Sequence, residues 1–419
     1  MTDVDEGSDR QGPKGPLDGL FVVEVATVIM GPFAGRQLAK LGADVIKVEA
    51  PSGDVLRRSG RSEQPGMTGT ALSLGDGKQN IVLDFRDAAD LSILHRLIAV
   101  ADVVLTNYLP RQRERFGLSW EAISEINPTC VLITAQGYSS TSEQGDIPAY
   151  DDTIEAASGV CDVYRRTDGE PRFPPYVLAD KVCGLSMIYA GLAAVYRRQV
   201  TGRGQWVDVP MFDVMTDFNL IEQLSDFSFD PPLGGPGWPR TIHPARRPHP
   251  TKDGWVCVLP YSDENWRRFL GLAGADDSEA SFSSHRERNE NVAEVQSIIA
   301  NYAKGRSTGE VIAQCSENGI PAQVVNSIED LVQDEYLRQR GSVEKFNHPD
   351  VGRIWRTTPN FGYSESPLTS PPPASGLGQD RETVMDLIVR RELVATKDCS
   401  KRREPREVDA FGSGEQSSG

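Results

Sequence analysis

The chain has 419 residues, and its 44 basic and 60 acidic side chains give a formal net charge of −16 at pH 7. Hydrophobic residues make up 38% and charged residues 25%, which excludes a fibrous or wholly disordered protein and suggests roughly two or three globular domains. A chain this acidic is a poor electrostatic partner for nucleic acid or an anionic membrane surface, so we expect neither as a partner.

The sequence contains no uninterrupted apolar stretch of the roughly 18 residues that span a bilayer. The best candidate, residues 182–196, is shorter and is flanked by Lys181 and by Arg197 and Arg198. The first 16 residues lack the apolar region of a signal peptide. The six cysteines are scattered without a CxxC pair, which predicts free buried thiols and no metal site. We therefore expect a cytoplasmic protein.

Apolar runs alternate with segments of helical spacing from about residue 16. FVVEVAT (21–27) is typical of a strand, Gly31-Pro32 is expected to end it, a helix is expected before Gly42, and VIKVEA (45–50) is the next strand. This alternation continues through VLITAQ (131–136) and predicts an α/β fold with a Rossmann-like parallel sheet. Residues 1–15 are expected to be a disordered leader.

The texture of the sequence changes after about residue 225. Loop-rich segments are followed by strand and helix patterns over 225–335, which we interpret as a second, smaller α+β domain. Residues 341–390 are expected to be extended segments that end in a helix over 381–394. The charged and then Ser/Gly-rich stretch 396–419 is expected to be a disordered tail.

Ordered sequence blocks over most of residues 17–390 resemble the family III CoA-transferases, which include formyl-CoA and carnitine CoA-transferases and alpha-methylacyl-CoA racemase. The blocks include LDGLFVVEVATVIMGPFAGRQLAKLGADVIKVEAPSGD (17–54), KQNIVLDF (78–85), ADVVLTNYLP (101–110), AYDDTIEAASG (149–159) and the segment 178–213. The resemblance implies a large CoA-binding domain built from 16–220 with 345–395. It also implies an interlocked homodimer with active sites between the large domain of one chain and the small domain of the other.

The resemblance assigns the catalytic role to Asp180. In family transferases an Asp at this position attacks the acyl-CoA thioester, and CoA then passes through a mixed anhydride and an aspartyl-CoA thioester to an acceptor carboxylic acid. Carboxylates are competent covalent catalysts when they are positioned and desolvated. Just before the long apolar helix, Asp180 is expected to be kept ionised by the helix dipole. The alternative reading is a plain helix N-cap.

Four other positions match or border residues that bind CoA in the family: Lys47, Lys78, Asn107 and Arg115. Tyr138, in a loop after a strand, and Tyr150 are further candidates for cofactor binding. Cationic side chains pair with nucleotide phosphates, and an Asn at a strand end can hydrogen-bond the ligand. The alternative for the cations is solvated surface charge. Ala50 stands where the formyl-CoA transferase pattern has Arg, so that one adenine or phosphate contact is expected to be either missing or supplied elsewhere, for instance by Arg57 or Arg111.

Tyr150 separates the two branches of the family. The racemase branch has a His at this position, and a tyrosine with a pKa near ~10 is a poor general base at neutral pH. The chain is therefore expected to be a CoA-transferase with acyl-CoA and a carboxylic acid as substrates and no prosthetic group. A 2-methylacyl-CoA racemase or epimerase, a non-catalytic CoA-binding protein and a nicotinamide-dependent oxidoreductase remain alternatives, although the glycine fingerprint of the last is missing. The alternative to a functional role for Tyr150 is that its ring packs against the protein with the hydroxyl hydrogen-bonded.

Overall fold

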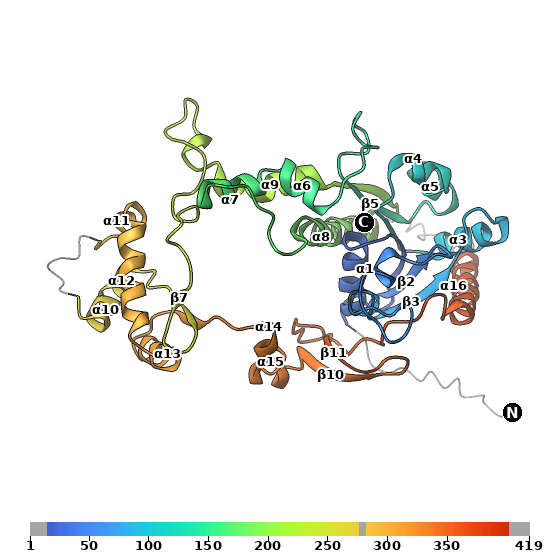
Figure 1. Ribbon diagram of the computed structural model, residues 1–419. Coiled ribbons are helices and arrows are strands. Elements are labelled where there is room, and N and C mark those ends of the chain that lie inside the picture. Colours follow the sequence, from blue (N-terminus) through green and yellow to red (C-terminus); the bar gives the residue numbers. More distant parts are fainter. Residues whose placement is uncertain (1–14, 276–281, 402–419) are drawn as a thin grey trace, which may run out of the picture.

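The computed structural model describes residues 15–275 and 282–401 and is built around a six-stranded parallel sheet with strand order β3-β2-β1-β4-β5-β6 (Figure 1). This order is that of a doubly wound nucleotide-binding fold, and it confirms the predicted parallel α/β sheet. The strands are β1 (Phe21–Val25), β2 (Asp44–Glu49), β3 (Lys78–Val82), β4 (Val103–Thr106), β5 (Val131–Gln136) and β6 (Gln205–Pro210).

Two layers of helices cover this sheet because its strands are apolar on both faces. In β1, Val22 belongs to the apolar cluster shared with α1 (Met30–Lys40), α8 (Leu178–Thr201) and α9 (Met211–Gln223). Its neighbours Phe21 and Val23 belong to the opposite cluster, which includes α3 (Ala88–Val100), α5 (Trp120–Ile126) and α16 (Arg381–Lys401). Helix α16 contributes Val384 and Ile388, so the end of the described chain packs against its beginning.

Helix α1 begins earlier than the sequence suggested. Gly31 and Pro32, expected to form a break, lie in its first turn. Proline is tolerated there because the first N–H groups of a helix have no intrahelical acceptor. The expectation that Gly31 and Pro32 end the strand is therefore wrong, because β1 already ends at Val25.

Helix α8 is also longer than the apolar stretch recognised in the sequence. With 24 residues it is long and apolar enough to cross a membrane by length and composition, although its uninterrupted apolar run, 182–196, is shorter, as the sequence indicated. Half of its most apolar window is buried, and Met187 and Ala194 lie in the core beside the sheet. The expectation of no membrane partner stays a prediction.

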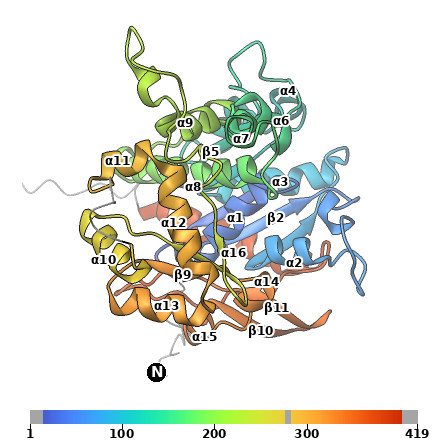
Figure 2. The same cartoon turned by 60° about the vertical axis from the view of Figure 1, so that its left-hand side comes forward.

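A second body follows the large sheet; it contains an antiparallel sheet of order β7-β8-β9 and the group of helices that Figure 2 shows beside β9. Its elements are β7 (His249–Pro250), β8 (Trp255–Val258), α10 (Asp263–Ala273), α11 (His285–Glu290), α12 (Val292–Lys304), α13 (Thr308–Glu317) and β9 (Ala322–Val324). Trp266, Phe269 and Ile299 are buried in its own core. Two connecting stretches join this body to the sheet in Figure 1. One runs through α9, and the other runs through α14 (Ile328–Leu331) and the hairpin of β10 (Val343–His348) and β11 (Gly352–Thr357). The domain boundaries and the interlocked dimer stay predictions.

The returning hairpin is fastened to α1. Arg36 Nη2 donates to Thr357 Oγ1 at 2.8 Å, and Lys40 Nζ donates to the Thr358 carbonyl at 2.9 Å. The remaining elements are α2 (Gly69–Gly75), α4 (Pro110–Arg115), α6 (Asp151–Ala157), α7 (Val160–Asp168), α15 (Glu335–Gln339) and the 3₁₀ helices Val55–Arg57 and Ser225–Ser228.

The C-terminal segment and one cysteine differ from what the sequence predicts. Residues 1–14 of the predicted leader and 402–419 of the predicted tail lie outside the described residues, but the backbone is helical through Lys401, so the tail does not begin at 396. The cysteines 130, 161, 183 and 315 are buried as predicted. Cys257 is exposed, which is contrary to expectation, and the side chain of Cys399 lies outside the described part.

Candidate active site

A cavity of about 240 Å³ lies at the carboxyl ends of β1, β4 and β5. The strand order reverses between β1 and β4, and ligands of doubly wound sheets bind at such switch points. The cavity is lined by Thr27, Val28, Ile29, Met30, Asn107, Tyr108, Leu109, Gln112, Gln136, Gly137, Pro148, Ala149, Tyr150, Asp180 and Met211. It therefore brings together three predicted site residues, Asp180, Asn107 and Tyr150, from separate parts of the sequence.

The loop after β1 lines this cavity and has a strained backbone. Val28 has a φ of +67°, an unfavourable left-handed conformation for a β-branched residue. Its N–H donates to Asp54 Oδ2 at 3.1 Å, which helps to hold the backbone in place. Asn107 fastens the same loop by accepting from Thr27 N at 2.9 Å and donating to the Thr27 carbonyl at 2.8 Å. Asn107 thus joins the ends of β1 and β4.

Asp180 is the third residue of α8 and is not its N-cap, which is Val177. The side chain is only 9% exposed and lines the cavity. It has no hydrogen bond or ion pair with the described residues, whereas its backbone N–H donates to Asp151 Oδ1 at 2.8 Å. The helix N-cap alternative is therefore wrong, and the carboxylate is left facing the cavity.

Burial and the nearby Asp151 carboxylate raise the pKa of Asp180 to about 7. This reverses the expectation that the helix dipole keeps Asp180 ionised. The physical reason lies in the first turn of α8, where the backbone N–H of Asp180 donates to the Asp151 carboxylate. The Asp180 side chain therefore lies near a negative charge as well as near the positive end of the helix dipole. At neutral pH both protonation states of Asp180 are populated.

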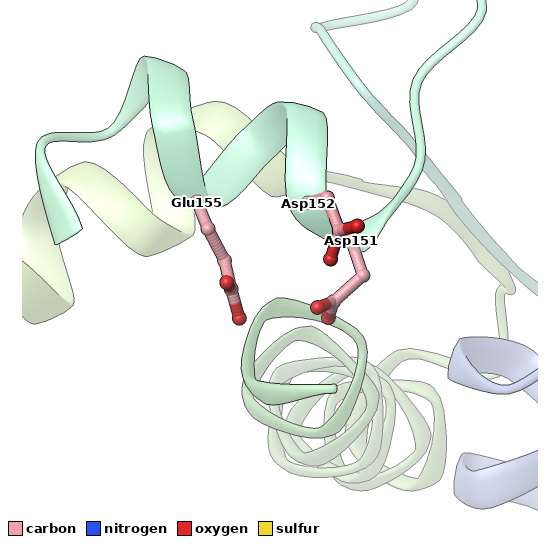
Figure 3. Close-up of side chains that lie close together, drawn as sticks. All are labelled: Asp151, Asp152 and Glu155. Carbon is pink, nitrogen blue, oxygen red and sulfur yellow. The ribbon is translucent and has the colours of Figure 1, made fainter. Parts of the chain in front are cut away.

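A buried acid pair on α6 supports the start of α8. Figure 3 shows Asp151 and Glu155 extending from α6 toward α8, which is seen end-on. Glu155 is fully buried, and its Oε1 accepts from Leu178 N at 3.2 Å. Burial and then the negative charge of Asp151 raise the pKa of Glu155 to about 7. Glu155 is therefore partly protonated at neutral pH, while Glu155 and Asp151 each accept from a backbone N–H in the first turn of α8.

Asp152 completes a group of three carboxyls with oxygens within 4.8 Å of one another. Asp152 is exposed, whereas Asp151 and Glu155 are buried and each accepts from a backbone N–H. The expectation of no metal stays a prediction. Glu155 was missed in the sequence, although its position four residues after Asp151 places the two acids on one helix face.

Lys47 and Lys78 lie in the core on either side of Glu24, which is fully buried in β1. Lys47 Nζ is 3.0 Å from Glu24 Oε1 and 3.3 Å from Asp54 Oδ2, and Lys78 Nζ is 2.5 Å from Glu24 Oε2 and 2.7 Å from the Pro32 carbonyl. The interpretation of both lysines as solvated surface charges is therefore wrong. Their contacts give no support to a phosphate-binding role, because each ammonium already has internal partners.

The two ammonium groups respond differently to this setting. Burial would lower the pKa of Lys47, but the charges of Glu24, Asp54 and Glu49 raise it above the usual value. Burial lowers the pKa of Lys78 to about 8 in spite of Glu24. Both remain predominantly cationic at neutral pH, as the neutralisation of Glu24 requires.

The other predicted CoA ligands lie apart from the cavity lining. Arg115 is exposed and its guanidinium lies 5.5 Å from the ring centre of Phe116, and Tyr138 packs against Phe212 with ring centres 5.5 Å apart. Arg57, considered as a substitute for the Arg missing at position 50, is buried with its Nη2 2.7 Å from Glu49 Oε1.

Tyr150 lines the cavity at the N-cap of α6. Its side chain is 67% exposed, so the alternative of a packed tyrosine is wrong. Its exposure leaves the ring accessible at the mouth of the Asp180 cavity.

The chain is similar to known proteins over most of its length. A family model described as CoA-transferase family III matches residues 17–381. The chain is 29% identical to succinate–glutarate CoA-transferase from Agrobacterium fabrum, over 93% of this chain and 100% of that protein. It is also 29% identical to the beta subunit of succinyl-CoA–L-malate CoA-transferase from Chloroflexus aurantiacus, over 89% and 94%. A crystal structure of a CAIB/BAIF family protein from Brucella suis superposes with a TM-score of 0.76 at 26% identity, covering 90% of this chain and 100% of that one.

Proposed function

The chain belongs to CoA-transferase family III and is an enzyme that transfers CoA, and from this premise we propose that Asp180 carries the transfer from an acyl-CoA donor to a free carboxylic acid. One observation supports this role above the others. Among the described residues, the Asp180 carboxylate has no hydrogen bond or ion pair although it is nearly buried, and it lines the cavity at the switch point of the sheet.

The proposed reaction has four acyl-transfer steps. The ionised Asp180 carboxylate attacks the thioester carbonyl, the C–S bond breaks, and CoA leaves as a thiolate from a mixed anhydride. The thiolate then attacks the Asp180 carbonyl, which releases the donor acid and leaves an aspartyl-CoA thioester. An acceptor carboxylate attacks this thioester to give a second anhydride, and the returning thiolate takes the acceptor acyl group and restores Asp180.

The surroundings of Asp180 suit these steps. Only the ionised carboxylate is a nucleophile, and a pKa near 7 leaves a useful fraction ionised while it increases the intrinsic nucleophilicity of that fraction. The burial that raises the pKa also limits the access of water to the anhydride, which water would hydrolyse. Tyr150 and Asn107 line the same cavity and are placed to contact the acyl group or the pantetheine arm.

Isotope transfer tests this sequence of steps. With succinyl-CoA and glutarate or L-malate, the acids named in its relatives, one ¹⁸O of a labelled acceptor carboxylate should pass to Asp180 and, in the next turnover, to the released donor acid. The Asp180→Ala variant should form no new acyl-CoA, whereas Asp213→Ala, which removes an exposed acid at the start of α9, should keep the activity.

Two results of the same experiment would count against the proposal. Transfer of CoA without ¹⁸O in the donor acid would mean that CoA moves without an anhydride. Uptake of deuterium at the α carbon of a 2-methylacyl-CoA, without any acceptor acid, would instead favour the racemase reaction.

The predicted homodimer is also part of the proposal. One face of α8 exposes large apolar side chains at helical spacing, namely Leu185, Tyr189, Tyr196 and Val200, between 49% and 73% exposed. An apolar stripe of this kind is typical of a face that another protein surface covers. Analytical ultracentrifugation of a Tyr189→Glu/Tyr196→Glu variant should give a monomer, and a dimer of unchanged stability would rule out this face as the interface.

A further inference from the structure

A second cavity, of about 280 Å³, lies in the body that contains the β7-β8-β9 sheet. It is bounded by β8, the start of α11, α12 and the loop 240–248. Val258, Val295 and Ile299 line it with buried apolar side chains and belong to the core of this body. The cavity therefore has an apolar floor that is fixed by the packing of α12 against the sheet.

Positive charge gathers at this cavity, which is unexpected in a chain with a net charge of −16. Arg240, Arg246 and Arg247 line it, and none of the three forms an ion pair with any residue that the structure describes. No acidic side chain is among the residues that line it. Three uncompensated guanidinium groups around an apolar hollow create a strongly positive local potential.

A fourth arginine has a structural role and is not available to a ligand. Arg288 is 6% exposed, and its Nη2 lies 2.6 Å from Asp263 Oδ1 and donates to the Tyr261 carbonyl at 3.1 Å. This arginine holds α11 to the start of α10. The uncompensated charge thus belongs to the three arginines of the 240–248 loop.

Two of the three loop arginines, Arg240 and Arg247, are partly held in place before any ligand arrives. The Arg240 guanidinium lies 5.0 Å from the ring centre of Tyr261 and 5.4 Å from that of Trp238. Arg247 Nε and Nη2 donate to the Pro244 carbonyl at 3.0 and 2.6 Å. Such restraint reduces the loss of side-chain entropy when an anion binds.

We propose that this cavity binds a small organic acid, with its carboxylate on Arg246 and Arg247 and its carbon chain on the apolar floor. A guanidinium presents paired N–H groups that match the two oxygens of a carboxylate. The volume lies below the about 300–1,000 Å³ typical of pockets for drug-sized ligands, which favours a short acid over a nucleotide. The inference does not depend on chemistry at Asp180.

Cys257 provides a reporter at the site itself. It lines the cavity and is exposed, whereas the cysteines at 130, 161, 183 and 315 are buried. A bound acid should therefore slow the alkylation of Cys257 by N-ethylmaleimide, measured by peptide mass spectrometry. The experiment uses the full chain with Asp180→Ala and no acyl-CoA, so that its outcome is separate from that of the transfer reaction.

We expect glutarate to protect Cys257 in a saturable manner. An Arg246→Gln/Arg247→Gln variant should bind glutarate at least about tenfold more weakly, because hydrogen bonds to charged groups are lost. Arg267→Gln, which removes an exposed arginine outside the cavity, is the matched control and should bind as the parent does.

Three results would overturn the inference. The first is that glutarate, succinate and L-malate all fail to protect Cys257. The second is that the double variant is protected as well as Arg267→Gln. Alternatively, adenosine 3′,5′-bisphosphate or inorganic phosphate would protect at lower concentration than any of the acids, which would make this a phosphate site.

Discussion

Replacement of Asp151 by Asn should lower the pKa of Asp180 while keeping the hydrogen bond at the start of α8. The Asn side-chain oxygen can accept from Asp180 N, which is 2.8 Å from Asp151 Oδ1 in the parent. What the substitution removes is a negative charge beside a nearly buried carboxylate. The nucleophile should then be ionised at lower pH.

The size of this effect follows from the causes of the shift. The pKa of Asp180 rises from an ordinary 3.8 to about 7, first through burial and second through Asp151. As the smaller of two causes, Asp151 contributes at most about 1.5 of these units, or about 2 kcal/mol. A pKa of about 5.5 in the variant would raise the ionised fraction at pH 6 from about 10% to about 75%, so the first step should become up to about eightfold faster there.

The assay is the single-turnover rate of acylation between pH 5 and 9, with rapid acid quenching and mass spectrometry of the intact protein. Asp152→Asn is the matched control, because Asp152 is the adjacent acid and is exposed. A parent enzyme whose acylation rate falls only below pH 4, or an Asp151→Asn variant whose acidic limb does not move, would refute the reasoning.

The remaining expectations concern stability and the other residues of the site. Asp180→Asn should raise the free energy of unfolding, measured in urea, by up to about 4 kcal/mol at pH 8 and little at pH 4. The reason is that the Asp180 carboxyl has a pKa of about 7 in the folded protein but an ordinary 3.8 when unfolded, so that the parent loses stability as the pH rises from about 4 to about 7. An equal gain at both pH values would contradict the raised pKa. Lys78→Ala should lower the free energy of unfolding by about 3 kcal/mol because it leaves Glu24 partly unpaired in the core, whereas Arg115→Ala should change it by less than about 0.5 kcal/mol. An intact Lys78→Ala fold with only a raised KM for CoA would instead favour a direct ligand contact. Tyr150→Phe should leave stability within about 0.5 kcal/mol, and a large loss on thermal melting would show that its hydroxyl is structural.

The parallel sheet could be predicted from the sequence because its signal is local. Runs such as FVVEV are apolar over a strand's length, and each is followed by helical spacing, so the order of elements was accessible without tertiary contacts. The position of Asp180 at the start of a long helix was accessible for the same reason. The resemblance to the family added the role of Asp180, which spacing alone does not provide.

The charged core was not predicted because burial of a charge depends on partners that are distant in sequence. Lys47 and Lys78 meet at Glu24 only when β1, β2 and β3 have assembled. A signal was nevertheless present, since Glu24 stands in the middle of an otherwise apolar strand and a buried carboxylate requires cations. The protonation state of Asp180 likewise depends on Asp151, 29 residues earlier, and could not follow from helix position alone.

The central claim, that Asp180 is the covalent acceptor of CoA, is tested most directly by mapping the enzyme–CoA intermediate. The protein is incubated with succinyl-CoA alone, reduced with borohydride, digested and sequenced by mass spectrometry. The account predicts that the Asp180 side chain is converted to an alcohol in the parent and in Asp213→Ala, with no reduced residue in Asp180→Ala. Reduction at another carboxylate, or none at Asp180 while CoA transfer proceeds, would contradict it.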